Sequence, residues 1–283
     1  MENGVQEKFQ SRVIRMKRAA VLGSPIKHSL SPVIHNAAYE MLGMEARYSA
    51  EEVGSGDLDG FLTAQLIDPS WMGFSLTMPL KEVICSLVDR FNIEIDPVAA
   101  RIHSANTLYK SDNSWSACST DVTGFSYLLR NRELSTISIL GSGGTARAAV
   151  ESLPSGSLIT IYRRSADRDA LFHSAFPETR IVFKDWSNVH ESWSSDLVIN
   201  AVPIAAINEL ISKFKAPRLL LDALYSPWMP PLTALQLSDG GEVISGLDLL
   251  CAQALEQIVL MTGEDFDKDE MFSLMRKRVE VSI

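Results

Sequence analysis

The stretch that decides the fold of this chain is TISILGSGGTA, residues 136–146. Its first five residues are mostly apolar and predict a buried strand, and the residues that follow fit the spacing G-x-G-x-x-A. Glycine is needed in such a loop because the backbone turns tightly and lets a pyrophosphate approach the N-terminus of the next helix. A second apolar run, 158–162, completes a strand–helix–strand unit. The pattern predicts a dinucleotide-binding unit, and a glycine-rich turn without a ligand is the alternative.

The end of the second strand indicates which dinucleotide is used. Arg163, Arg164 and Ser165 follow it, at the place where an NAD site carries an Asp or Glu for the ribose 2′-hydroxyl. Two guanidinium groups and a hydroxyl suit a doubly charged 2′-phosphate better. The sequence therefore predicts NADP as the cofactor, although exposed Arg pairs also occur at helix starts that bind no ligand.

Outside this unit, apolar and amphipathic segments alternate, which is the pattern of an α/β protein. In the first 120 residues, strands are expected at 18–23, 47–53 and 71–77, helices at 31–43, 57–67 and 79–91, and a hairpin at 106–109 and 114–119 with its turn at 111–113. After a helix at 121–131, further strands are expected at 180–183, 196–200, 218–222 and 242–245.

The last two segments, 247–262 and 266–279, look like helices with no strand after them. Because an α/β unit needs no such pair, we expect the chain to return there and pack on the first unit. The expected organisation is an α/β fold with two domains. Residues 1–120 together with 247–283 form one, and residues 121–246 form the other, a doubly wound domain of Rossmann type.

Composition and charge limit the classes of function. A formal net charge of −9 argues against unspecific binding to nucleic acid or to an anionic membrane, because both would repel the chain. The three cysteines, Cys85, Cys118 and Cys251, show neither metal-ligand spacing nor a disulfide framework, so we expect no metal and a reducing compartment. The first 18 residues have no apolar core and do not form a signal peptide. A cytoplasmic location is therefore expected.

Three polar groups in the first unit indicate chemistry only weakly when each is taken alone. Ser29 and Ser31 follow the first strand, where an S-x-S-P pattern is better explained as a helix cap with Ser31 at the N-cap. Lys81 lies where a strand meets a helix, four residues after Thr77, and a solvated surface lysine is the simpler interpretation. Asp121 is equally explained as the N-cap of its helix.

Together these groups belong to seven motifs that occur in order along the chain. The motifs are SPIKHSLSP at 24–32, GFSLTMPLK at 73–81, SANTL at 104–108, STDVTG at 119–124, GSGGTA at 141–146, LDALYSPW at 221–228 and ISGLDLLCAQ at 244–253. In this order and spacing the chain resembles shikimate dehydrogenases over residues 19–275, most of all the actinobacterial branch. The resemblance implies a substrate domain formed by the N-terminal half and the C-terminal helices, with the active site in the cleft beside an NADP-binding domain.

The resemblance also implies roles for individual residues. Lys81 and Asp121 match the catalytic lysine–aspartate pair. The implied substrate contacts are Ser29, Ser31, Thr77, Asn106, Tyr225 and Gln253. The implied cofactor contacts are Gly141, Ser142, Gly143, Gly144, Thr145 and Ala146 in the glycine loop, then Arg164 and Ser165, with Arg163 beside them where the family usually has Asn.

The implied activity is reversible reduction of the C3 carbonyl of 3-dehydroshikimate by hydride from NADPH, a step of aromatic amino-acid (chorismate) biosynthesis. Lys81 would donate the proton while Asp121 orients it. The chain departs from the family pattern at Ser75 and Ser119, where Asn is usual, and at residues 202–205, which leaves the nicotinamide contacts open.

Two alternatives remain beside this interpretation. An NAD-preferring quinate/shikimate dehydrogenase is opposed by the two arginines after the second strand. A catalytically silent binding homologue is opposed by the presence of Lys81 and Asp121. The expected partner is a small-molecule substrate, and the resemblance leaves open whether the chain is a monomer or a homodimer.

Overall fold

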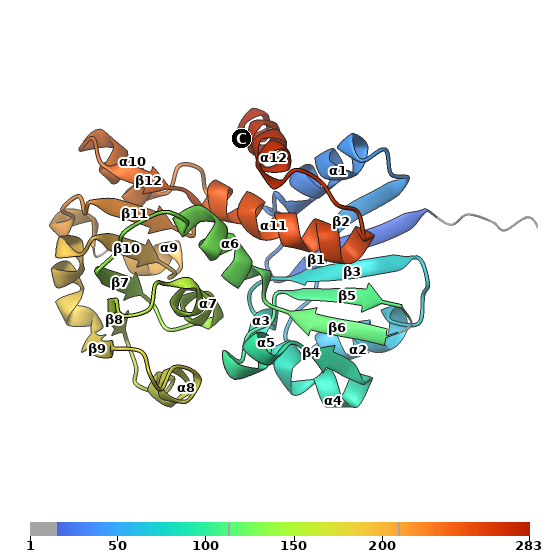
Figure 1. Ribbon diagram of the computed structural model, residues 1–283, viewed down its shortest axis with the longest axis horizontal. Coiled ribbons are helices and arrows are strands. Elements are labelled where there is room, and N and C mark those ends of the chain that lie inside the picture. Colours follow the sequence, from blue (N-terminus) through green and yellow to red (C-terminus); the bar gives the residue numbers. More distant parts are fainter. Residues whose placement is uncertain (1–15, 113, 209) are drawn as a thin grey trace, which may run out of the picture.

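The computed structural model describes residues 16–112, 114–208 and 210–283 and arranges them as two α/β halves placed side by side (Figure 1). Each half is built on one six-stranded sheet. The expected α/β class is therefore confirmed. Of the first 18 residues, 1–15 lie outside the described residues, as does Asn113 of the expected hairpin turn.

The first sheet has the strand order β2-β1-β3-β5-β6-β4. Its strands are β1 (Lys17–Gly23), β2 (Ala46–Glu52), β3 (Trp71–Leu76), β4 (Ile93–Ile95), β5 (Thr107–Ser111) and β6 (Ser114–Cys118). β1 runs parallel to β2 and β3, whereas β5 runs antiparallel to both β3 and β6. The helices of this half are α1 (Ser31–Met41), α2 (Leu58–Gln65), α3 (Leu80–Val83), α4 (Val88–Phe91) and α5 (Pro97–Arg101).

The second sheet is parallel throughout, in the order β12-β11-β10-β7-β8-β9. Its strands are β7 (Thr136–Leu140), β8 (Leu158–Arg163), β9 (Ile181–Asp185), β10 (Leu197–Asn200), β11 (Leu219–Asp222) and β12 (Glu242–Ile244). Helices connect the strands: α6 (Thr120–Leu129) leads in, followed by α7 (Gly144–Ser152), α8 (Asp169–Ala175), α9 (Ile204–Ile207) and α10 (Pro231–Ser238). This is the doubly wound Rossmann order, in which a crevice forms beyond the carboxyl ends of β7 and β10, where the strand order reverses.

The chain then returns to the first half, as expected. Helices α11 (Gly246–Thr262) and α12 (Lys268–Ser282) pack against α1, and α11 also lies along α6 and over β3 and β5 (Figure 1). One apolar cluster joins the three helices, with Ile34 of α1, Leu255 and Ile258 of α11, and Met275 of α12 fully or almost fully buried. Burial of this shared face is what holds the two C-terminal helices on the first half.

Some expected elements need correction. Residues 79–91 do not form one helix, because a 3₁₀ turn (Ile84–Ser86) separates α3 from α4, in a segment whose β-branched residues are weak helix formers. Ser31 is the first residue of α1, and Leu30 occupies its N-cap. Asp121 lies in the first turn of α6, and Ser119 is the N-cap. No bounds were predicted for β4, α5, α8, α9 and α10, although the doubly wound domain that was expected implies helices between its strands.

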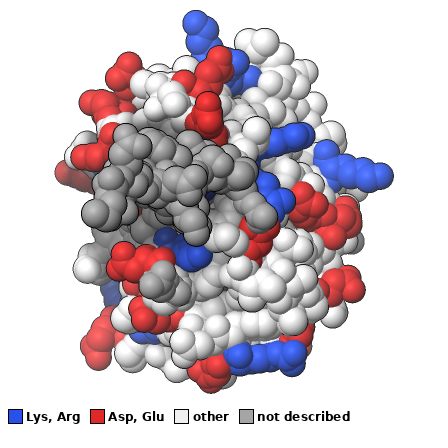
Figure 2. Space-filling view, turned by 90° about the vertical axis from the view of Figure 1, so that its right-hand side faces the viewer, with Lys and Arg blue, Asp and Glu red and all other residues white. Residues whose placement is uncertain are grey.

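The surface is of mixed charge on the face shown in Figure 2. Outside the residues that are not described, Lys and Arg side chains alternate there with Asp and Glu. Such a distribution offers no extended basic area to a polyanion. Among the described residues, no helix combines the length and the apolar character needed to span a membrane.

Candidate active site

Two cavities meet between the halves, beyond the carboxyl ends of the strands. The larger, of about 760 Å³, is lined mainly by the glycine loop, by residues 162–168 and by residues 201–203. The smaller, of about 180 Å³, is lined by the first half and by α11. Thr77, Lys81 and Thr145 line both cavities. A molecule in one cavity would therefore adjoin a molecule in the other at these three side chains.

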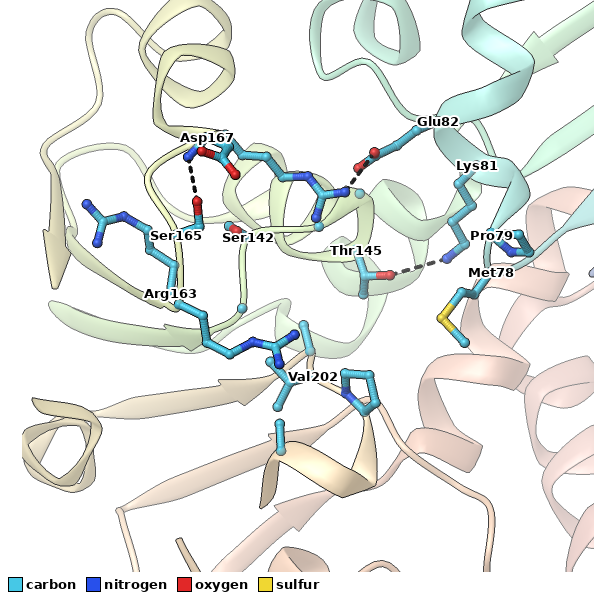
Figure 3. A pocket seen from close by; sticks show the side chains of 18 of the residues that line it. Met78, Pro79, Lys81, Glu82, Ser142, Thr145, Arg163, Ser165, Asp167 and Val202 are labelled. Atoms are coloured by element: carbon cyan, nitrogen blue, oxygen red, sulfur yellow. Dashed lines mark hydrogen bonds and ion pairs between the residues drawn. The ribbon is translucent and has the colours of Figure 1, made fainter. Parts of the chain in front are cut away.

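The Lys81 side chain lies at this junction and does not extend into solvent. Its Nζ donates to Asp121 Oδ2 at 2.6 Å. It also donates to Thr145 Oγ1 at 3.3 Å, the contact marked in Figure 3. The side chains of Lys81 and Asp121 are only 20% and 7% exposed. The interpretation of Lys81 as a solvated surface lysine is therefore wrong. An ammonium group held on a buried carboxylate, with an open cavity beside it, is suited to donating a proton.

The other carboxylate oxygen of Asp121 is held by Asn106. Asn106 Nδ2 donates to Asp121 Oδ1 at 2.9 Å and to Gln253 Oε1 at 3.3 Å. Gln253 is brought to this position by α11, which lies so close to α6 that a Cβ on Gly124 would be 2.9 Å from the Gln253 backbone nitrogen. Glycine at position 124 is thus required for the packing that brings Gln253 to Asn106.

The small cavity gathers all eight residues expected to bind substrate or to carry out catalysis. They are Ser29, Ser31, Thr77, Lys81, Asn106, Asp121, Tyr225 and Gln253. Burial raises the pKa of the Tyr225 hydroxyl, while a hydrogen bond with Ser29 lowers it. Neutral hydroxyl and amide groups opposite one ammonium group suit a small polyhydroxylated anion.

The glycine loop connects β7 to α7. Gly141 has a φ of +109°, a backbone conformation that residues with a side chain rarely adopt. A Cβ on Gly144 would lie 2.3 Å from Ser104 Oγ. The loop thus requires glycine both for its turn and for its contact with the first half. Because α7 begins at Gly144, unpaired backbone N–H groups at its N-terminus face the larger cavity, an arrangement that favours a phosphate.

One member of the expected loop does not reach the cavity. Ala146 is fully buried in the apolar core of the second half and is absent from the lining residues. The expectation that Ala146 contacts the cofactor is therefore corrected. Its small side chain instead allows α7 to pack closely on the sheet.

The two arginines at the end of β8, Arg163 and Arg164, have different surroundings. The Arg163 guanidinium donates to both carboxylate oxygens of Asp169 at 2.8 Å and to Asp185 Oδ1 at 2.9 Å, and its side chain is only 13% exposed. Arg163 lines the cavity, but the two carboxylates engage three of its five N–H donors and its charge, so it is less suited to a phosphate than Arg164. Arg164 and Ser165 are exposed at the cavity wall, where a phosphate can reach them.

Sequence reasoning missed the charged groups that join the two halves. Glu82, the residue after Lys81 on α3, accepts from Arg147 of α7 at 2.8 Å and from Arg168 at 3.0 Å. Arg168 also lines the larger cavity, three residues after Ser165. Because Arg168 follows the expected phosphate-binding pair so closely, the sequence could have indicated that it lies at the same cavity. Arg147 was unpredictable, because its partners are distant in the sequence.

This arrangement defines the class of the protein. A parallel doubly wound sheet with a glycine loop, beside a cavity that holds a lysine–carboxylate pair, is the architecture of a nicotinamide-dinucleotide oxidoreductase. Among the described residues, no group of three or more His, Cys, Asp or Glu side chains is placed to hold a metal ion.

Comparison with known proteins identifies the family. The family model described as the shikimate dehydrogenase substrate binding domain matches residues 21–108. A shikimate dehydrogenase (NADP(+)) of Moorella thermoacetica is 31% identical, over 93% of this chain and 94% of that protein. The crystal structure of Mycobacterium tuberculosis shikimate dehydrogenase is 33% identical, with a TM-score of 0.81 over 92% of this chain and 99% of that one. The chain belongs to the shikimate dehydrogenase family.

A further solved structure bears on the ligands. The shikimate dehydrogenase of Thermus thermophilus, in complex with NADP(H) and shikimate, is 27% identical, with a TM-score of 0.76 over 93% of this chain and all of that one.

Proposed function

We propose that this chain catalyses the reversible, NADP-dependent reduction of 3-dehydroshikimate to shikimate, a step in the biosynthesis of chorismate and the aromatic amino acids. The observation that carries the proposal is the Lys81–Asp121 pair at the junction of the two cavities. The similarity to NADP-dependent shikimate dehydrogenases along most of the chain supports the same reaction.

The larger cavity fits a phosphorylated dinucleotide. The glycine loop and the N-terminus of α7 would hold the pyrophosphate. Arg164 and Ser165 would hold the 2′-phosphate, since Arg163 is engaged by two aspartates. Bound NADPH supplies a hydride to the carbonyl carbon of the substrate.

Lys81 completes the reduction by donating a proton to the carbonyl oxygen as that oxygen gains negative charge. The ketone thus takes up one hydride and one proton and becomes a secondary alcohol. Asp121 keeps the ammonium group in place at 2.6 Å, and Asn106 keeps Asp121 in place. Oxidation in the reverse direction requires Lys81 to accept the proton, so a higher pH should favour it.

The remaining residues of the small cavity would bind the rest of the substrate. We assign Ser29, Ser31 and Tyr225 to its carboxylate, and Thr77, Asn106 and Gln253 to its hydroxyl groups. In domain terms, we propose that residues 1–120 with 247–283 bind the substrate and that residues 121–246 bind the cofactor. A cytoplasmic location is part of the proposal and is tested by cell fractionation, while light scattering would decide between a monomer and a homodimer.

A spectrophotometric assay tests the function. The purified protein should oxidise NADPH when 3-dehydroshikimate is added, and should reduce NADP with shikimate. The same assay with NADH, and with quinate and each oxidised cofactor, distinguishes the NAD-linked quinate/shikimate alternative. No turnover with any pair of substrates would favour a catalytically silent homologue.

A further inference from the structure

A row of buried hydrogen bonds leads away from Asp121 into the first half. Asp121 Oδ1 accepts from Asn106 Nδ2 at 2.9 Å, and Asn106 Oδ1 in turn accepts from the Thr107 hydroxyl at 3.0 Å. The Thr120 hydroxyl lies 3.1 Å from both Thr107 Oγ1 and Asn106 Oδ1, so it offers a second route between them. All four residues are almost completely buried.

The row continues beyond Thr107 across two sheet strands and α11. Thr107 Oγ1 accepts from Gln257 Nε2 at 3.0 Å, and Gln257 Oε1 accepts from the Ser75 hydroxyl at 2.7 Å. Ser75 Oγ accepts from the Tyr48 hydroxyl at 2.6 Å. The His35 ring stacks on Tyr48, with centroids 4.0 Å apart, and its Nε2 lies 3.2 Å from Gln257 Oε1.

Backbone groups fix the direction of this row. The Thr120 N–H, which can only donate, lies 2.7 Å from the Asn106 side-chain oxygen. The Asn106 carbonyl, which can only accept, lies 3.4 Å from Gln257 Nε2. These contacts decide which end of each amide is oxygen. Every proton along the row therefore points toward Asp121.

The members of the row stay neutral, so its direction does not change with pH. Burial lowers the pKa of His35 to about 3, and a hydrogen bond to Gln257 opposes this shift. Burial raises the pKa of Tyr48 well above its ordinary value. The titratable groups lining the small cavity are Lys81, Asp121 and Tyr225, and burial raises the pKa of Tyr225 as well.

A row of donors aligned in this way acts on its last acceptor more strongly than an isolated amide. Aligned hydrogen bonds polarise one another by about 10–30% per bond, and here the last acceptor is a carboxylate. The row holds Oδ1 of Asp121 and keeps its Oδ2 turned toward Lys81.

We propose that Thr107 and Gln257 are positioning residues for the reduction: they lock the Asn106 amide so that the Asp121 carboxylate stays directed at Lys81. This inference rests on the proposed function. Thr107 is fully buried and lines neither cavity, so it acts on the reaction only through Asn106 and Thr120. Gln257 lines the small cavity as well, so Thr107 is the cleaner position for a test.

The test is the pH profile of kcat for reduction of 3-dehydroshikimate at saturating NADPH. Thr107→Val keeps the shape of the side chain and removes the hydroxyl. We expect a two- to tenfold lower kcat, the effect of about one hydrogen bond. Because a less firmly held Asp121 supports the ammonium group of Lys81 less well, we also expect the alkaline limb of the profile to move about 0.4–1 pH unit toward lower pH. Thr107→Ser, which keeps the hydroxyl, should have nearly the parental kcat and the parental alkaline limb. Gln257→Met should move the limb in the same direction by a smaller amount.

Thr233→Val is the matched control. Thr233 is buried in the second half and donates to a buried carboxylate, Asp222 Oδ2, at 3.0 Å, but it lines neither cavity. The Thr233→Val variant should lose a similar amount of stability in urea and keep the parental pH profile. If Thr107→Val acted only by lowering stability, it too would keep the parental pH profile.

Three outcomes overturn the inference. In the first, folded Thr107→Val and Gln257→Met enzymes keep the parental alkaline limb. In the second, Thr233→Val moves the limb equally. In the third, the parent itself is inactive, which removes the proposed function as well, whereas an active parent confines the failure to the hydrogen-bond row. If Thr107→Val does not fold, Thr107→Ala, which removes the same hydroxyl, decides.

Discussion

Replacing Arg147 by Met should loosen the junction between the two halves. The Arg147 side chain is fully buried and makes four hydrogen bonds. It donates to the carbonyl oxygens of Ile102 at 2.6 Å, His103 at 3.1 Å and Ser142 at 3.1 Å, and to Glu82 at 2.8 Å. Three of these partners belong to the first half and the fourth lies in the glycine loop. Arg147 therefore fixes the position of that loop relative to α3.

The magnitude follows from what the substitution leaves behind. Methionine fills most of the space but donates to none of the three carbonyl groups, and Glu82 keeps only its contact with Arg168. A buried carbonyl left without a donor costs about 1–3 kcal/mol, so the three carbonyl groups together cost about 3–5 kcal/mol. Glu82, which is 30% exposed and still paired with Arg168, adds little. We expect a loss of that size in the free energy of unfolding. We also expect a higher KM for NADPH, because the loop that would hold the pyrophosphate is no longer anchored.

Urea denaturation of parent and variant measures the stability, and initial rates at varied NADPH measure the KM. Arg90→Met is the control, because Arg90 is 62% exposed and pairs with Asp59 of the same half at 2.8 Å. An exposed pair of this kind contributes about 1 kcal/mol or less. If Arg147→Met is no more destabilising than Arg90→Met, the reasoning about the junction is refuted.

Three further predictions concern the site and the core. Lys81→Ala should lower kcat by roughly two to four orders of magnitude in the assay of NADPH oxidation, and near-parental turnover would remove Lys81 from proton transfer. Arg164→Leu should raise the KM for NADPH about ten- to hundredfold, whereas Arg163→Leu should mainly lower the urea midpoint; equal effects on KM would contradict the separation of the two arginines. Burial lowers the pKa of His35 from 6.5 to about 3, so below pH 6.5 the unfolded chain takes up a proton that the folded chain does not. Stability is therefore complete above pH 6.5 and falls by about 2 kcal/mol by pH 5, a dependence that His35→Gln should flatten in urea titrations.

Elements that depend on neighbouring residues could be predicted from the sequence. The apolar run 136–140 followed by the glycine spacing predicts a strand, a tight turn and a helix start, because these depend on neighbouring residues alone. The return of the two C-terminal helices was likewise predictable, since an apolar helix pair without a following strand must bury its face elsewhere. The segment 79–91 was not, because apolar spacing does not distinguish one helix from two short ones joined by a 3₁₀ turn.

The sequence by itself determined the α/β class, the position of the glycine loop and, through its ordered motifs, the family. Only the tertiary structure decided which side chains act together. Lys81 and Asp121, weak signals when each stood alone, lie 2.6 Å apart, whereas two neighbouring arginines have different surroundings because Asp169 and Asp185 engage only Arg163. The row from Tyr48 to Asp121 had no sequence signal. The physical reason is that hydrogen bonds and burial depend on distances between elements that are remote in the chain. Only the packing of the two sheets and α11 sets these distances.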